Sequence, residues 1–140
     1  MARILAIDYG KKRVGLAVTD PLKKIANGLA TVSTVNIWDY LENYLGKEKI
    51  ECIVVGYPRQ LNNKPSDACK YINPFIKKLK KTYSDIAVKL MDERFTSKLA
   101  LQVMLESGLK KKARQNKELV DTISATIILQ SYLEIILNKQ

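Results

Sequence analysis

Acidic residues at the ends of predicted strands, and one acid on a predicted helix, are the side chains of this sequence best suited to chemistry. Asp8 follows the apolar run Ile4–Ile7, and Asp92 and Glu93 follow another predicted strand. Asp121 lies on the apolar stripe of the last predicted helix, where a carboxylate is costly unless it is paired or bound to a metal. Carboxylate oxygens select hard cations, so this pattern indicates a site for Mg²⁺ or Mn²⁺.

We expect Asp8, Glu93 and Asp121 to form one catalytic metal site, with Asp92 as an open additional neighbour. Taken singly, each acid has a structural explanation. Asp8 could accept hydrogen bonds in a turn, Glu93 could pair with Arg94, and Asp121 could face water. Together, the acids could hold two Mg²⁺ or Mn²⁺ ions. Two such ions about 4 Å apart can activate a water and stabilise the leaving oxygen of a phosphodiester. The acids together predict a two-metal phosphodiesterase.

The charge and composition narrow the class of protein further. The 140 residues include 24 Lys or Arg and 14 Asp or Glu, and the net charge of +10 favours nucleic acid as the partner. There is no His, which excludes Ser-His-Asp triads and imidazole zinc sites. The two cysteines, Cys52 and Cys69, are too few for a four-thiolate metal site, and we expect buried or idle thiols.

Basic residues gather in three clusters. Residues 11–13 lie in and after a predicted turn, and Ser107–Lys117 holds five basic residues and no acid. Because both clusters lie in loops beside the acids, we expect them to contact phosphates. The third cluster, Lys77–Lys81, is equally compatible with a solvated helix face. The predicted nucleic-acid-binding residues are Lys11, Lys12, Arg13, Arg94, Lys110, Lys111, Lys112 and Arg114.

Five predicted strands position these residues. The hydrophobic pattern places them at residues 2–8, 13–19, 29–34, 51–56 and 86–91. The first three pair antiparallel through short connections, and the first two form a hairpin. The last two each follow a helix, so they lie parallel to the first strand through right-handed crossovers. The prediction is an α/β fold with a mixed five-stranded sheet and helices on both faces.

Four predicted helices complete the chain, at residues 37–45, 66–81, 96–106 and from 116 or 117 to 137. Gly46 is expected to end the first helix. Tyr71, Phe75 and Leu79 give the second helix its apolar face. The apolar stripe of the last helix is expected to contain Ala125, Ile128, Tyr132 and either Ile135 or Ile136.

No repeat, linker or low-complexity stretch divides the sequence, so we expect one domain over residues 1–140. The apolar runs are far shorter than the about 20 residues of a membrane span, and no secretory signal is visible. We therefore expect a cytoplasmic protein without a membrane partner. A monomer and a homodimer are both compatible with the sequence. Tyr9 and Tyr57, at strand ends, could stack on a base or simply pack.

Four segments of the sequence resemble the motifs of the YqgF/RuvX family, in the family's order and over almost the whole chain. The similar segments are Ile7–Ala17, Val54–Pro58, Asp92–Ser97 and Asp121–Leu129. The resemblance implies an RNase H-like fold of the RuvC type. It also implies that Asp8, Glu93 and Asp121 are the acidic metal-binding set.

The resemblance further implies a nuclease that matures the 5′ end of precursor 16S ribosomal RNA, with ribosomal particles as candidate partners. The enzymatic alternative is a Holliday junction resolvase, for which branched DNA would favour a symmetric dimer. A non-catalytic RNA-binding assembly factor is the alternative from another class, and its acids would be structural. A sugar-kinase or actin-like ATPase would need two such domains, whereas 140 residues supply one.

Overall fold

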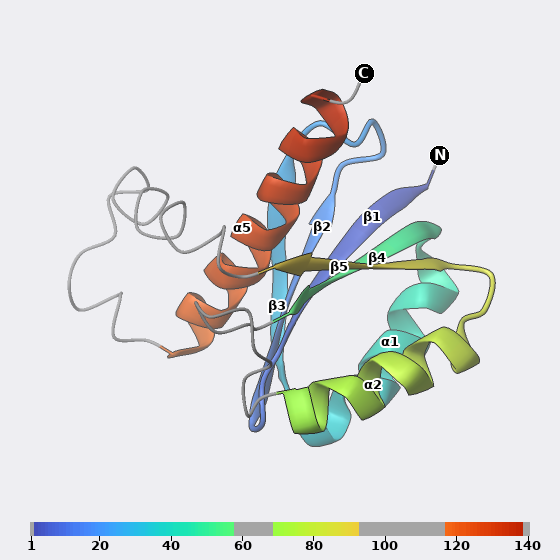
Figure 1. The fold of residues 1–140 in the computed structure, drawn as a ribbon, viewed down its shortest axis with the longest axis vertical. Coiled ribbons are helices and arrows are strands. Elements are labelled where there is room, and N and C mark those ends of the chain that lie inside the picture. Colours follow the sequence, from blue (N-terminus) through green and yellow to red (C-terminus); the bar gives the residue numbers. More distant parts are fainter. Residues whose placement is uncertain (1, 58–68, 93–116, 139–140) are drawn as a thin grey trace.

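The computed structural model describes residues 2–57, 69–92 and 117–138 (Figure 1). A five-stranded sheet runs through the molecule in the order β3-β2-β1-β4-β5. Its strands are β1 (Arg3–Tyr9), β2 (Arg13–Thr19), β3 (Ala26–Ser33), β4 (Ile50–Tyr57) and β5 (Ala87–Asp92). The β1–β2 and β2–β3 pairs are antiparallel, and the β1–β4 and β4–β5 pairs are parallel. The predicted mixed sheet is confirmed.

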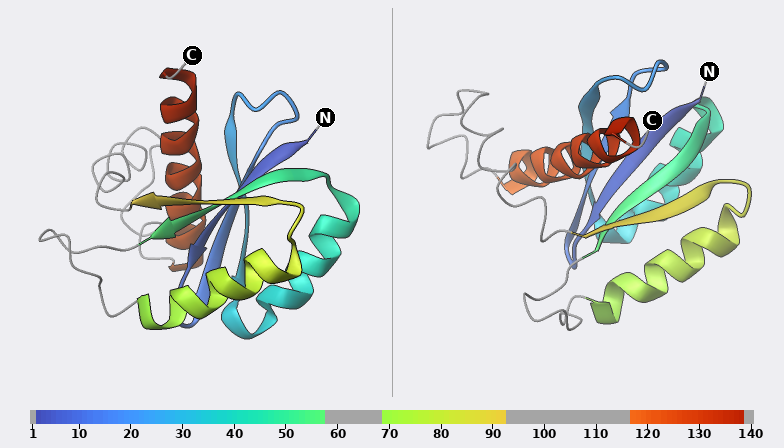
Figure 2. Two further views of the ribbon diagram at one scale, coloured as in Figure 1. Left: turned by 45° about the vertical axis from the view of Figure 1, so that its right-hand side comes forward. Right: turned by 45° about the horizontal axis from the view of Figure 1, so that its top comes forward.

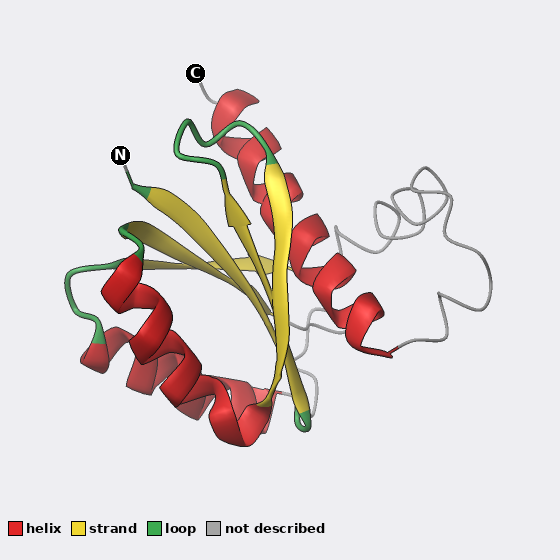
Figure 3. Cartoon of the chain, turned by 180° about the vertical axis from the view of Figure 1, so that it is seen from behind, coloured by secondary structure: helices red, strands yellow, loops and turns green. Residues whose placement is uncertain are grey.

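Helices cover both faces of this sheet, as predicted. The helices α1 (Ile37–Lys47) and α2 (Cys69–Thr82) pack side by side on one face, and α5 (Lys117–Asn138) crosses the other (Figures 1 and 2). The view from behind shows the sheet between the two layers (Figure 3). A short 3₁₀ turn, Thr34–Asn36, leads into α1. Within the described ranges, no helix combines the length and the apolar character needed to cross a bilayer.

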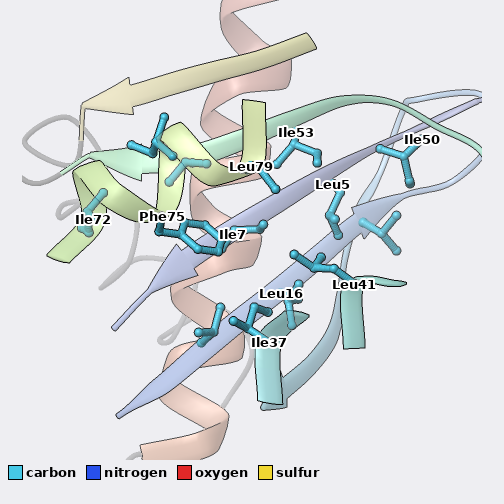
Figure 4. Close-up of a cluster of buried hydrophobic side chains, with 14 residues drawn as sticks. Leu5, Ile7, Leu16, Ile37, Leu41, Ile50, Ile53, Ile72, Phe75 and Leu79 are labelled. Atoms are coloured by element: carbon cyan, nitrogen blue, oxygen red, sulfur yellow. The ribbon is translucent and has the colours of Figure 1, made fainter. Parts of the chain in front are cut away.

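Two apolar cores form because successive side chains of a strand point to opposite faces of the sheet. The core against α1 and α2 includes Leu5, Ile7, Leu16, Ile37, Leu41, Ile53, Ile72, Phe75 and Leu79 (Figure 4). The core against α5 includes Ile4, Ala6, Ala17, Cys52, Val54, Met91, Ala125, Ile128, Leu129 and Leu133. Burial on both faces explains why β1 and β4 have continuous apolar sequences. Cys52 and Cys69 are both buried, as predicted.

Strand β3 begins at Ala26, three residues before its predicted start. The carboxylate of Asp20 organises the preceding turn, since its Oδ1 accepts hydrogen bonds from the amides of Lys24 (2.9 Å) and Ile25 (2.8 Å). Its Oδ2 accepts a third, from Leu22 N at 3.2 Å. The turn is therefore compact, and the chain returns to the sheet earlier than the Thr- and Val-rich segment indicates.

The helices also differ from the prediction in detail. Helix α1 passes through Gly46 and ends at Lys47, two residues after its predicted end at residue 45. On α2, Phe75 and Leu79 are buried as predicted, whereas Tyr71 is 36% exposed because it lies at the rim of the apolar face. The predicted helix at 96–106 lies outside the described residues.

Candidate active site

Asp8 is the penultimate residue of β1 and is half-buried at the carboxyl end of that strand. Ile4 and Ala6 belong to the core beneath α5, and Leu5 and Ile7 belong to the core on the other face. Alternate residues of a strand share a face, so Asp8 continues the series of Ile4 and Ala6. Its carboxylate lies on the face that α5 covers, at the strand end where open α/β sheets bind ligands.

Glycine flanks Asp8 on both neighbouring strands. On β2, Asp8 pairs with Gly15. On β4, Val55 pairs with Ile7, and the next residue is Gly56. The positions directly across from Asp8 on these two strands therefore carry no side chain. Glycine in a strand interior often marks a place where a ligand approaches closely. The row of residues across β2, β1 and β4 at Asp8 contains two such glycines, Gly15 and Gly56.

Asp92, the open neighbour of the predicted acidic set, lies on the opposite face of the sheet from Asp8. Met91 pairs with Gly56 and belongs to the core beneath α5. Asp92 pairs with Tyr57, one residue further on, and so projects toward the face of α1 and α2. The pleat of β5 thus separates Asp92 from the Asp8 carboxylate.

A close contact fixes α5 on β3 beside this row of residues. Gly15 pairs with Thr31 of β3, and the Oγ1 atoms of Thr31 and Thr122 lie 2.5 Å apart. A Cβ added to Gly28 would lie 2.6 Å from Cγ2 of Thr122, so the helix approaches β3 as closely as a glycine allows. Thr122 directly follows Asp121 in α5. The contact therefore fixes the position of the backbone that carries the predicted third acid.

The buried stripe of α5 agrees with the predicted helical phase. Asp121 lies in the first turns of α5, and its side chain lies outside the described part of the structure. Ala125, one turn later, is fully buried, and Ile128 is also in the core beneath α5. Of the two candidates at the end of the stripe, Ile136 packs against this core, whereas Ile135 is exposed.

The described basic residues of the predicted site lie at the turn between β1 and β2. Lys11 and Lys12 are exposed, and Arg13 is half-buried at the start of β2. Thr34 holds the turn, because its amide donates to Lys12 O (3.0 Å) and its hydroxyl donates to Gly10 O (2.8 Å). A Cβ on Gly10 would lie 2.5 Å from Arg13 O, so the turn requires glycine.

The remaining predicted site residues lie outside the described ranges; they are Glu93, Arg94, Lys110, Lys111, Lys112 and Arg114. Among the residues whose side chains the structure describes, which exclude Asp121, no group of three or more His, Cys, Asp or Glu could hold a metal. Asp8 is the member of the predicted set whose side chain the structure describes.

The two tyrosines at the strand ends pack against α2. The ring of Tyr9 stacks on Phe75, with centroids 4.2 Å apart. Burial, with a smaller effect of Tyr71, raises the pKa of Tyr9. The hydroxyl of Tyr57 donates to Asn73 Oδ1 at 2.8 Å. Packing therefore accounts for both rings, and these contacts fasten α2 to the strand ends that border the site.

The sequence prediction does not include Gly28, Thr31 or Thr122 in the site. Thr31 and Thr122 are 91 residues apart, and only the register of β3 against α5 brings them together. The one signal in the sequence is the position of Thr122 directly after Asp121.

Comparison with known proteins shows a match to the RuvX family, described as "Holliday junction resolvase", over residues 2–135. A curated relative from Phocaeicola vulgatus is 61% identical over 134 residues, which is 96% of each chain. A relative from Bacteroides fragilis is 58% identical over 134 residues, 96% of this chain and 97% of its own. Both carry the name "Putative pre-16S rRNA nuclease".

Two solved structures share the fold at low sequence identity. The Fowlpox virus resolvase, in complex with Holliday junction DNA, aligns with a TM-score of 0.62 at 14% identity, over 96% of this chain and 99% of its own. Thermus thermophilus RuvC, also with a Holliday junction, aligns with a TM-score of 0.57 at 16% identity, over 96% of each chain.

The strand order, the helices on both faces and the likeness to RuvC show an α/β protein with an RNase H-like fold. The chain belongs to the RuvX family. Membership identifies it as a nuclease, a hydrolase of phosphodiester bonds, and nucleic acid as its class of partner.

Proposed function

We propose that this protein is a divalent-metal-dependent nuclease that matures the 5′ end of precursor 16S ribosomal RNA in the cytoplasm. The observation that carries the proposal is the setting of Asp8. The carboxylate lies at the carboxyl end of β1, between Gly15 and Gly56, on the face to which Thr31 and Thr122 fix α5. The names of relatives at 58–61% identity support precursor 16S rRNA as the substrate, and so support ribosomal particles as partners.

We assign Asp8, Glu93 and Asp121 as the ligands of Mg²⁺ or Mn²⁺. Position 121 is one turn before the buried Ala125, which supports an approach of Asp121 to the sheet. Because Asp92 belongs to the other face, an acid one position away in an extended chain would belong to the face of Asp8. This alternation supports Glu93 as the ligand rather than Asp92.

The donor set fits a hard divalent cation, since it consists of carboxylate oxygens in a chain without His. When bound, such ions activate a water and stabilise the leaving oxygen of the phosphodiester. The two glycines beside Asp8 leave room for the backbone of the substrate. Lys11 and Lys12, exposed on the adjacent turn, neutralise phosphates near the cleaved bond without reading sequence.

We assign the same positioning role to the other basic residues that the sequence predicts: Arg13, Arg94, Lys110, Lys111, Lys112 and Arg114. The competing substrate is a Holliday junction, which the description of the family and the bound DNA of both structural neighbours favour. A non-catalytic assembly factor would bind RNA through the same basic residues. Its function would not change when one of the acids is replaced.

A cleavage assay separates these three functions. The wild type and the Asp121→Asn variant are given a precursor 16S fragment or a synthetic four-way junction, with Mg²⁺, with Mn²⁺ or with a chelator. Asp85→Asn, at an exposed position in the turn after α2, is the matched control. We expect metal-dependent cutting of the RNA by the wild type and by the control, and none by Asp121→Asn. Cutting of the junction alone would establish the resolvase, and binding without cutting would establish the assembly factor.

A further inference from the structure

The outer face of α2 is a row of lysines without any acid. The helix contains Lys70, Lys77, Lys78, Lys80 and Lys81, all exposed, and its sequence has no Asp or Glu. Its buried face consists of Cys69, Ile72, Phe75, Ile76 and Leu79, and Ile72, Phe75 and Leu79 are labelled in Figure 4. Amphipathic packing requires only that the outer face be polar. The neighbouring α1 meets that need with Asp39, Glu42 and Lys47, so packing on the sheet does not by itself require the charge bias of α2.

Three of these lysines form a straight stripe. Lys70, Lys77 and Lys81 follow each other at intervals of seven and four residues, which places them on one line of the helix. That line is opposite the buried Ile72 and Leu79. The eleven steps from Lys70 to Lys81, at about 1.5 Å each, give about 16 Å, which is the length of several successive phosphates. We call Lys70, Lys77 and Lys81 the lysine stripe.

The spacing of these lysines is unfavourable within an isolated helix. The ion pairs Arg3–Glu48 and Lys23–Glu51 join residues outside α2. The helix dipole favours lysines in the last turn, but it opposes Lys70 in the first. Lys77 and Lys81 are four residues apart, where like charges repel each other. Lys78 differs, because its Nζ lies 4.4 Å from the ring centroid of Trp38.

The lysine stripe starts next to the β1–β2 turn, on the face of the sheet opposite α5 and the Asp8 carboxylate. Tyr9, the residue after Asp8, stacks on Phe75 of α2, and Tyr57 at the end of β4 donates to Asn73. Figures 1 and 2 show the β1–β2 turn next to the start of α2 in each view. A strand of nucleic acid that passes the turn can therefore continue along α2, away from the site.

We propose that the lysine stripe is a second phosphate-binding surface, which holds RNA beyond the segment that reaches the active site. This proposal rests on the proposed function, because it takes RNA as the bound nucleic acid. It does not depend on whether the protein cleaves that RNA. Because a cation–phosphate contact releases a counterion, each contact adds to the salt dependence of binding. A longer RNA engages the lysine stripe and a short one does not.

The test is RNA binding by fluorescence anisotropy, in chelator, as a function of salt. The probes are single-stranded RNAs of about 8 and about 30 nucleotides, chosen to cover one site or to extend beyond it. The test variant is Lys70→Gln/Lys77→Gln/Lys81→Gln. The matched control is Lys24→Gln/Lys47→Gln/Lys49→Gln, which removes the same charge from exposed positions outside α2.

For the longer RNA, we expect the test variant to bind about tenfold more weakly and to reduce the slope of log affinity against log salt by about 2. The short RNA should bind both variants alike, and thermal melting should confirm that both are folded. Equal loss in the two variants would attribute the effect to net charge and would overturn the proposal. A wild type that binds neither RNA would instead refute the proposed function.

Discussion

Replacing Gly28 with Ala tests how closely α5 packs on β3. The new Cβ would lie 2.6 Å from Cγ2 of Thr122, a separation that real Cβ contacts do not show. Thr122 cannot simply rotate away, since its hydroxyl is paired with Thr31 at 2.5 Å. The helix must therefore shift away from β3, and the shift would begin at the residue next to Asp121.

Overpacking of this kind costs about 1–3 kcal/mol of folding free energy. In a chain of 140 residues, that cost corresponds to a melting temperature lower by about 3–10 °C. Gly46→Ala is the matched control, because a Cβ there meets no atom within 4 Å and the position is helical. The control should gain about 0.4–1 kcal/mol. Circular dichroism during heating measures both changes, and the cleavage assay should show lost activity for Gly28→Ala only.

A second substitution identifies the clash itself. Thr122→Ser removes the Cγ2 atom and keeps the hydroxyl that pairs with Thr31, so it should restore much of the stability of Gly28→Ala. The reasoning would be refuted if Gly28→Ala gained stability as Gly46→Ala does. It would also be refuted if the serine failed to restore the double variant, because the cost would then come from the strand rather than from the helix contact.

Three further predictions concern the strand ends and the lysine turn. Thr19→Val should lower the free energy of unfolding by about 1–3 kcal/mol in urea, because the buried amide of Ile4 donates to Thr19 Oγ1 at 3.0 Å and would lose its acceptor; an unchanged midpoint would contradict it. Three backbone amides lower the pKa of Asp20 below its usual 3.8, so its stabilising effect is present above that value and lost as the pH falls through the lower folded pKa. Asp20→Asn should therefore flatten the acid limb of the stability–pH curve, and a variant with the wild-type limb would disprove this. Gly10→Ala should displace the turn and weaken RNA binding, since its Cβ would lie 2.5 Å from Arg13 O, and unaltered affinity would count against the turn as a phosphate contact.

The order and direction of the strands could be predicted from the sequence because they follow from local rules. The short connection at Gly10–Lys12 requires an antiparallel hairpin, and the helices before β4 and β5 require parallel crossovers. The start of β3 could not be predicted, since it depends on the side chain of Asp20 bonding three amides of the turn. Tyr71 fits the helical spacing of Phe75 and Leu79, but its exposure depends on where the sheet beneath α2 ends.

For the candidate site, the sequence shows which acids end the strands but not which face each one joins. The pairing of Met91 with Gly56 is what assigns Asp92 to the face opposite Asp8, and this register is absent from the sequence pattern. The same holds for Thr31 and Thr122, which meet through packing between distant segments. Composition and motifs identify the chemistry, whereas the register determines the partners.

The most direct test of the central claim is the initial rate of cleavage of the precursor 16S fragment by Asp8→Asn, measured against Mg²⁺ concentration. Asn keeps the size of the side chain and removes the charge that would hold the cation. We predict a rate at least about 10²-fold below that of the wild type at every Mg²⁺ concentration, with an unchanged melting profile. A variant that cleaves at the wild-type rate with the same Mg²⁺ dependence would contradict the assignment of Asp8 to the metal site.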